Sequence, residues 1–310
     1  MRVFVSSPLP GDAIERLRAI ADVTVGARVG DAADTGDWDA IVALLTDRID
    51  ASVLLRSPRL RVVANVAVGV DNVDVDACRA RSVVVTNTPG VLTEATADFA
   101  FALLLAAARR VAEGDRFVRR GDFHGWTPTM MLGARVHGMT LGIVGLGRIG
   151  RAVARRARGF GMHVIYTQRT RLDLLLERAL GATFVDLDAL FEASDAVTLH
   201  CPLTAETRHI VSAARLARMK PTAILVNTAR GPCVDEAALA HALASERISA
   251  AGIDVFEDEP RVHPALLASE RAVLAPHIAS ADRPTREAMA RIAADNVVAI
   301  LTDRPPITPV

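Results

Sequence analysis

Lysine is almost absent from this chain of 310 residues: Lys220 is the only one among 36 basic residues. Arginine therefore carries nearly all of the positive charge, which suits two-pronged binding of carboxylate or phosphate, although genomic base composition explains the general excess more simply. Acidic residues also number 36, so the net charge is zero. A chain without excess charge gives no reason to expect nucleic acid or an anionic membrane as a partner.

Cysteine is scarce as well. Cys78, Cys201 and Cys233 are odd in number and show no C-x-x-C spacing, which argues against a disulfide framework and a zinc ribbon and fits a reducing compartment. The eight histidines show no H-x-x-x-H or paired spacing, so no metal site is predicted.

Long hydrophobic runs are missing too. The apolar stretch at the N-terminus is too short for a signal peptide. The most apolar segment, residues 99–108, is about half the length of a membrane span, and two arginines follow it. We therefore expect a soluble, cytoplasmic protein with no membrane partner.

Short apolar strands alternate with helical segments along the chain, a pattern typical of parallel sheets with helices on both faces. The strands are expected at residues 2–5, 23–25, 40–44, 60–64, 83–85, 141–144, 163–167, 183–185, 196–199, 223–226, 250–255 and 272–274. Among the helices, we expect one continuous helix from Thr93 to about Arg120 and a last one from Pro284 to Leu301. The sequence thus predicts an α/β protein with doubly wound sheets.

A glycine-rich turn joins the expected strand at 141–144 to a helix. Gly145, Gly147 and Gly150 fall in a G-x-G-x-x-G frame, and Arg148 and Ile149 begin the helix. Such a turn offers backbone N–H groups and the positive end of a helix to a pyrophosphate. The motif alone also fits a plain strand–turn–helix, but the strand before it and the helix after it favour a dinucleotide site.

The end of the second strand of such a site selects the cofactor. An Asp or Glu there binds the ribose 2′-hydroxyl of NAD, but this chain has Gln168, followed by Arg169 and Arg171. No carboxylate repels a 2′-phosphate, and two guanidinium groups can pair with one. The sequence therefore predicts NADP(H) in preference to NAD(H); solvated loop arginines are the alternative.

Three chemically capable residues follow three later strands: Arg230 in NTARG, Glu259 in DVFEDEP and His277 in APHIAS. Each alone also fits a surface charge or a structural histidine. Behind a dinucleotide loop they describe a reaction. Arginine binds a 2-oxo acid and polarises its carbonyl, histidine donates a proton to the carbonyl oxygen, and a carboxylate orients the histidine.

With these motifs the sequence resembles the D-isomer-specific 2-hydroxyacid dehydrogenase family, and most of all its glyoxylate/hydroxypyruvate reductase branch. The resemblance covers nearly the whole chain. Its motifs are VGVDNVD (68–74), NTPGVLTEATAD (87–98), LGIVGLGRIG (141–150), HCPLTAETRHI (200–210), NTARG (227–231), DVFEDEP (254–260) and APHIAS (275–280). The tract YTQRTR (166–171) is similar to NADP-preferring members.

The resemblance implies roles for individual residues. Arg230, Glu259 and His277 match the catalytic arginine, glutamate and histidine. The backbone amides of Val68 and Gly69 are implied to hold the substrate carboxylate. Taken without the resemblance, their loop fits an ordinary strand-to-helix turn better than an anion-binding nest. The remaining implied cofactor contacts are Thr96, Cys201, Pro202, Thr207, Thr228, Ala229 and Asp254.

The resemblance also implies an architecture and an activity. The fold would comprise two Rossmann-like lobes with the active site in the cleft between them: a substrate domain of residues 1–98 and 285–310, and a dinucleotide-binding domain of residues 99–284. The chain would form a homodimer through the long helix after Thr93. It would reduce glyoxylate or hydroxypyruvate by hydride transfer from NADPH, with His277 as the proton donor.

Other readings of the same fold remain to be weighed. Glu259 argues against a formate dehydrogenase, which carries glutamine there, and the chain has no room for the regulatory domain that many phosphoglycerate dehydrogenases add. A 2-ketogluconate reductase and a non-catalytic nucleotide-sensing partner protein stay open. Two residues depart from the family pattern: Ala279 stands where glycine is common, and Asp282 where threonine is frequent.

Overall fold

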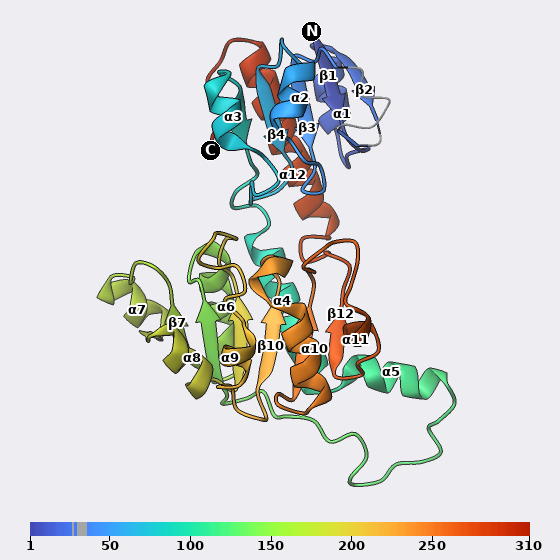
Figure 1. The fold of residues 1–310 in the computed structure, drawn as a ribbon, viewed down its shortest axis with the longest axis vertical. Coiled ribbons are helices and arrows are strands. Elements are labelled where there is room, and N and C mark those ends of the chain that lie inside the picture. Colours follow the sequence, from blue (N-terminus) through green and yellow to red (C-terminus); the bar gives the residue numbers. More distant parts are fainter. Residues whose placement is uncertain (27, 30–35) are drawn as a thin grey trace. The chain divides into compact units, whose positions relative to one another are not determined.

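We describe the protein from a computed structural model, in which residues 1–26, 28–29 and 36–310 are the ones described here. The chain divides into two compact units (Figure 1): Met1–Leu92 with Ser280–Val310, and Thr93–Ala279. Each unit is a parallel sheet with helices, so the predicted α/β class is confirmed. The assignment of residues 1–98 and 285–310 to substrate binding, and of 99–284 to the dinucleotide, stays a prediction.

The first unit is built on a five-stranded parallel sheet in the order β2-β1-β3-β4-β5. Its strands are β1 (Arg2–Val5), β2 (Asp22–Val25), β3 (Ala40–Ala43), β4 (Val62–Asn65) and β5 (Val84–Thr86). Its helices are α1 (Ala13–Arg18), α2 (Ala51–Arg56), α3 (Val75–Ala80) and α12 (Arg283–Leu301). Helix α12 returns from the far end of the chain to pack on α1, β3 and β4, as Figure 1 shows.

The N-terminus of α12 explains one departure from the family pattern. Asp282 is its N-cap, and its carboxylate accepts hydrogen bonds from the Thr285 amide at 2.7 Å and the Thr285 hydroxyl at 2.8 Å. A side-chain oxygen in this position satisfies backbone N–H groups that have no partner inside the helix. Asp282 therefore has a structural function here.

The second unit is built on a seven-stranded parallel sheet in the order β12-β11-β10-β9-β6-β7-β8. Its strands are β6 (Thr140–Val144), β7 (His163–Thr167), β8 (Ala182–Phe184), β9 (Ala196–Leu199), β10 (Ile224–Asn227), β11 (Ala250–Ile253) and β12 (Ala272–Leu274). The chain order reverses between β6 and β9. In such sheets the crevice at the carboxyl ends of the two strands where the order reverses is the ligand site.

Helices cover both faces of this sheet. The second unit contains a short 3₁₀ turn at Gly231–Cys233. Its helices are α4 (Thr93–Ala108), α5 (Val111–Arg119), α6 (Arg148–Gly159), α7 (Leu174–Leu180), α8 (Leu187–Ala193), α9 (Ala213–Leu216), α10 (Glu236–Ala244) and α11 (Pro264–Leu267). Alternate residues of β10 enter opposite cores: Ile224 and Val226 pack with α4 and α6, and Leu225 packs with α8 and α10. The two-residue period of a strand thus supplies both layers.

The expected continuous helix from Thr93 to Arg120 is wrong. It ends at Ala108, and a new helix begins at Val111 after Arg110, whose φ of 54° is left-handed. The carbonyl of Ala108 accepts the amide of Ala134 at 2.8 Å, and the Arg110 guanidinium grips Glu113 at 2.6 and 2.7 Å. The amide of Ala134 therefore binds the carbonyl of Ala108, which would accept an amide of the next helical turn if the helix continued.

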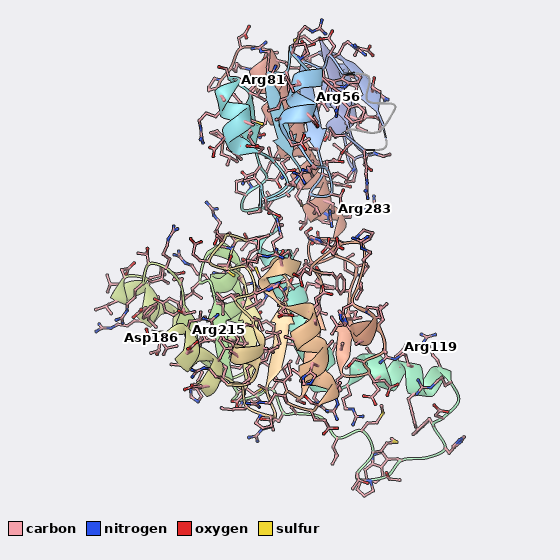
Figure 2. The ribbon with its side chains drawn as sticks, viewed as in Figure 1. Arg56, Arg81, Arg119, Asp186, Arg215 and Arg283 are labelled. Atoms are coloured by element: carbon pink, nitrogen blue, oxygen red, sulfur yellow. The ribbon has the colours of Figure 1, made fainter. Side chains whose placement is uncertain are left out.

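Arginine side chains lie on the outside of this unit. Figure 2 labels Arg119 on α5 and Arg215 on α9, which pair with Asp115 at 2.9 Å and Asp188 at 3.1 Å. Exposed pairs of this kind contribute little stability. Among the helices of the described residues, none is long and apolar enough to cross a membrane.

Candidate active site

The glycine-rich turn lies where the strand order of the second unit reverses. Gly145 follows β6 with a φ of 93°, and a Cβ on it would lie 2.8 Å from the backbone of His200 and Cys201, after β9. A Cβ on Gly150 would lie 2.2 Å from the carbonyl oxygen of Gly145. These two positions require glycine, one for its conformation and both for close backbone approach.

The N-terminus of α6 fits a pyrophosphate. Gly147 is the N-cap and supplies no side chain, so the first amides of the helix, from Arg148 and Ile149 onward, have no partner within it. A Cβ on Gly147 would meet nothing within 4 Å. The open space beside unpaired amides suits an anionic group with the helix dipole behind it.

The structure separates the two arginines predicted to select the cofactor. Gln168 accepts the Leu146 amide at 3.0 Å, which links the end of β7 to the glycine turn. Arg171 is held by Glu177, with Nε and Nη2 each 2.8 Å from a carboxylate oxygen. Arg169 is exposed and forms no ion pair with any residue that the structure describes.

Glu177 is a buried carboxylate that the sequence analysis missed. Arg171 and then the Tyr166 hydroxyl, 2.7 Å from Oε1, hold the pKa of Glu177 at about 2. The Tyr166 hydroxyl also accepts the Leu172 amide at 2.9 Å. The charge of Arg171 is therefore balanced by a buried carboxylate, whereas that of Arg169 faces solvent.

Several predicted cofactor residues surround the ends of β9, β10 and β11. Thr228 and Ala229 follow β10, and Asp254 follows β11; the Thr207 hydroxyl donates to the Pro202 carbonyl at 2.7 Å. Thr96 is buried on α4. Contact with Cys233, together with burial, raises the pKa of the Cys201 thiol, so this thiol stays protonated.

Two buried polar atoms near these loops have no hydrogen-bond partner among the described residues. They are Oγ1 of Thr228 and Nδ1 of His200. Burial lowers the pKa of His200 to about 3, so its ring is neutral. Unsatisfied buried polar atoms are costly unless a ligand or water pairs with them, and their position here fits a bound cofactor.

His277 and Glu259 are paired. Nδ1 of His277 lies 2.9 Å from Oε2 and 3.2 Å from Oε1 of Glu259, and about a quarter of each side chain is exposed. Burial acts to raise the pKa of Glu259, but the hydrogen bond and charge of His277 outweigh it, and the pKa lies below its ordinary value. Glu259 also accepts the Phe256 amide at 3.0 Å.

Asp254 shapes the backbone that carries His277. Its carbonyl accepts the His277 amide, and its two carboxylate oxygens accept the amides of Ile278 and Ala279, all at 2.8 Å. His277 itself has a left-handed φ of 57°. Burial raises the pKa of Asp254 against the lowering effect of those two amides. A histidine with a left-handed φ, in a loop that one residue holds by three hydrogen bonds, is typical of a functional site.

The loop that carries Arg230 touches the loop that carries Glu259. The Asn227 amide holds the Arg230 carbonyl at 2.9 Å, and the Arg230 guanidinium donates to the Ala229 carbonyl at 2.8 Å. A Cβ on Gly231 would lie 1.8 Å from the carbonyl oxygen of Phe256. The structure thus brings Arg230, Glu259 and His277, predicted from three separate motifs, onto neighbouring loops of one unit.

His209, Glu257 and Glu236 tie these two loops together and were not foreseen. His209 Nε2 lies 2.6 Å from Glu257 Oε1, and the His209 amide donates to Pro232 at 2.8 Å. Glu236, at the start of α10, accepts the Glu257 amide. Each residue alone resembles a surface charge in the sequence, so only the fold reveals the cluster.

The predicted substrate loop lies in the first unit, after β4. The carbonyl of Val68 accepts the Asn87 side-chain amide at 2.8 Å, and that of Gly69 accepts the Asn65 side-chain amide at 2.9 Å. The backbone N–H groups of Val68 and Gly69 donate to no residue that the structure describes. Two adjacent amides without a partner are able to bind an anion, and the role of Val68 and Gly69 toward the substrate stays a prediction.

Comparisons with known proteins decide the family. Residues 101–279 match the model of the D-isomer specific 2-hydroxyacid dehydrogenase NAD-binding domain. The chain is 57% identical to a glyoxylate reductase of Korarchaeum cryptofilum over 85% of this chain and 80% of that protein. It is 47% identical to a glyoxylate reductase of Thermococcus onnurineus over 99% of this chain and 95% of that protein.

The chain belongs to the D-isomer specific 2-hydroxyacid dehydrogenase family. A crystal structure of an NADPH-dependent glyoxylate/hydroxypyruvate reductase from Sinorhizobium meliloti, with NADP and malonate, superposes with a TM-score of 0.89 at 36% identity, covering 100% of this chain and 96% of that one. As a member of this family, the protein is an oxidoreductase that acts on the CH–OH group of 2-hydroxy acids with a nicotinamide cofactor. The described residues contain no group of three or more His, Cys, Asp or Glu side chains placed to hold a metal ion.

Proposed function

We propose that this dehydrogenase reduces glyoxylate or hydroxypyruvate with NADPH to the corresponding 2-hydroxy acid. The observation that carries the proposal is the His277–Glu259 pair at 2.9 Å on the loop beside that of Arg230. This is a proton donor with its orienting carboxylate next to a guanidinium. The similarity to proteins named glyoxylate reductase supports the choice of acid.

The substrate carboxylate would bind the free amides of Val68 and Gly69, and Arg230 would hold and polarise the 2-oxo group. When bound, the reduced nicotinamide supplies the hydride that adds to C2. Because Glu259 occupies Nδ1 of His277, the proton leaves from Nε2 and passes to the carbonyl oxygen. The products balance as a 2-hydroxy acid, the oxidised cofactor and a deprotonated His277.

Arg169 would give the preference for NADPH. Its charge faces solvent, and no carboxylate stands at Gln168. Arg171 keeps its contact with Glu177. Because its Nε and Nη2 bind that carboxylate, only its Nη1 would be left to bind the 2′-phosphate. Charge-assisted bonds to a 2′-phosphate contribute roughly 1.5–3 kcal/mol each.

The test is loss of NADPH absorbance with purified protein and glyoxylate, hydroxypyruvate, pyruvate and 2-ketogluconate in parallel, repeated with NADH. Faster turnover with NADPH and with either of the first two acids supports the proposal, and Arg169→Ala should then narrow the difference between the cofactors. A preference for 2-ketogluconate would favour that reductase branch. Cofactor binding without turnover of any acid would favour a nucleotide sensor.

We also propose that two copies associate through α5 and the segment after it. Val118, Phe123, Trp126 and Leu132 are 51–74% exposed there. Large apolar side chains gathered on one protruding segment mark an interaction site. A cytoplasmic location is proposed as well, because the free thiols Cys78, Cys201 and Cys233 suit a reducing compartment.

A further inference from the structure

The loop proposed to bind the substrate carboxylate is held from behind, by its carbonyl groups. The carbonyls of residues 67–70 accept, in order, the Thr88 amide at 2.9 Å, the Asn87 side chain at 2.8 Å, the Asn65 side chain at 2.9 Å and the Val73 amide at 2.9 Å. Because a peptide plane is rigid, fixing a carbonyl fixes the direction of the next amide. Asn87, which holds the carbonyl of Val68, therefore aims the amide of Gly69.

Asn87 is itself held by a segment more than two hundred residues away in the sequence. The Thr308 hydroxyl donates to the Asn87 carbonyl at 2.6 Å, and the Asn87 amide donates to the Thr308 carbonyl at 3.2 Å. Thr86 pairs with Pro309 in an antiparallel bridge, and the Val310 amide donates to Val85 at 3.0 Å. The segment thus extends β5 on its outer side.

A buried asparagine on α12 fixes that segment in turn. Asn296 is fully buried, and its Nδ2 donates to the Thr308 hydroxyl at 2.9 Å. Its Oδ1 accepts the amides of Ile307 at 2.9 Å and Thr308 at 3.0 Å. The hydroxyl of Thr308 is the link, because it accepts from Asn296 and donates to Asn87.

We propose that Asn296, Thr308 and Asn87 form a relay that positions the substrate loop, so that Thr308 sets affinity for the 2-oxo acid without touching it. The proposal rests on the proposed carboxylate-binding role of Val68 and Gly69. Thr308 is a positioning residue: losing its hydroxyl removes the shorter of the two hydrogen bonds between Thr308 and the Asn87 backbone, and the amide of Gly69 is then held less firmly in its direction. Buried hydrogen-bond networks of this kind rigidify the parts they connect.

The test compares Thr308→Val with Thr308→Ser and Asn87→Ala, and with Thr302→Val as the control. Thr302 also lies beyond α12, but its hydroxyl donates to the Val298 carbonyl at 2.7 Å and makes no contact with the relay. The measurements are kcat and KM for glyoxylate, the Kd for NADPH, and the Kd for malonate measured by calorimetry with NADP⁺ present. Malonate reports carboxylate binding without turnover.

We expect Thr308→Val to raise KM for glyoxylate and Kd for malonate about two- to tenfold, the factor that one hydrogen bond supplies, with kcat and Kd for NADPH unchanged. Thr308→Ser should keep the wild-type KM and Kd. The double variant Thr308→Val with Asn87→Ala should bind malonate no more weakly than Asn87→Ala alone. Thr308→Ala replaces Thr308→Val if the latter does not fold.

Malonate affinity in Thr308→Val equal to that in Thr302→Val would overturn the relay, as would a parallel loss of malonate and NADPH affinity. A double variant weakened by the product of the single effects would overturn it too. A wild-type protein that binds malonate but reduces no acid would contradict the proposed function, and the malonate arm would still decide the relay. A wild-type protein that neither binds malonate nor reduces any acid would overturn both, and one that reduces glyoxylate without binding malonate would leave the decision on the relay to KM.

Discussion

At the scale of single residues, the proposed reaction depends on His277. Nδ1 of His277 faces Glu259, so in the proposed reaction Nε2 is the nitrogen that serves the substrate oxygen. Three bonds to Asp254 hold the backbone there. The tautomer and the direction of the ring are thus both determined before any ligand binds, which is what general acid catalysis requires.

Removing the imidazole should remove the proton donor and little else. We expect His277→Ala to lower kcat by about 10²–10⁴-fold, the usual contribution of general acid–base catalysis, while the Kd for NADPH stays within a factor of about two. Steady-state kinetics and fluorescence titration of NADPH measure the two quantities. Glu259→Gln should keep the imidazole ring of His277 in place and should lower kcat less than His277→Ala does. Near-wild-type turnover by His277→Ala would show that another group donates the proton.

The residue scale also shows where sequence reasoning reached its limit. The family motifs located Arg230, Glu259 and His277, and the structure places them on neighbouring loops. The same reasoning assigned Arg171 to cofactor binding without taking Glu177 into account. Glu177 lies on α7, is buried against Tyr166 and binds Arg171. A buried glutamate in an amphipathic helix has no signature apart from its partners, and these become neighbours only in the folded chain.

At the scale of elements, nearly every strand was predictable and one helix was not. Short runs such as 196–199 are buried along their whole length, so a short, mostly apolar run between helical segments identifies a buried strand without knowledge of its partners. The break between α4 and α5 follows from the bond between Ala108 and Ala134 and from the left-handed Arg110. Neither glycine nor proline marks it, so local sequence predicts one continuous helix.

Two loops of the site act together through His209, which leads to a prediction. His209 binds Glu257 on the loop of Glu259 and Pro232 beside the loop of Arg230. His209→Ala should free these loops and lower kcat/KM roughly tenfold or more, since a hydrogen bond to a charged group is worth about 1.5–3 kcal/mol. Glu206→Gln, an exposed change on the same loop, should have little effect. Equal kinetics in the two variants would mean that Gly231 packing alone positions the loops.

The hydrogen bond between Tyr166 of β7 and Glu177 of α7 should make the stability of the protein depend on pH. Arg171 and Tyr166 hold the pKa of Glu177 at about 2, below its ordinary 4.5. A carboxylate with a lowered pKa stabilises the fold fully above pH 4.5, and this contribution is lost as the pH falls toward 2. Glu177→Gln should therefore lower Tm at pH 7 and converge with the wild type in acid. Parallel Tm curves for the two proteins across that range would show that Glu177 is not the group responsible.

At the scale of the whole molecule, the exposed apolar side chains are unevenly distributed. Trp126 is 74% and Leu132 is 67% exposed, on a segment that follows an amphipathic helix with no buried residue of its own. Isolated apolar residues on a surface are ordinary, but several large exposed apolar side chains on one segment are not. A helix with one apolar side and no fully buried residue offers that side to a second chain, as the proposed association requires.

The proposed association through this segment can be tested by charge. Trp126→Glu and Leu132→Glu should shift the protein from dimer to monomer, because an aromatic anchor at an interface contributes about 2 kcal/mol or more, roughly a thirtyfold change in Kd. Leu55→Glu, on the similarly exposed Leu55 of α2 in the other unit, is the matched control and should leave the assembly intact. Sedimentation over a range of concentrations measures the shift. A wild-type protein that is monomeric throughout, or a Trp126→Glu dimer as tight as that of Leu55→Glu, would place the interface elsewhere and leave the apolar side chains of this segment without a partner chain.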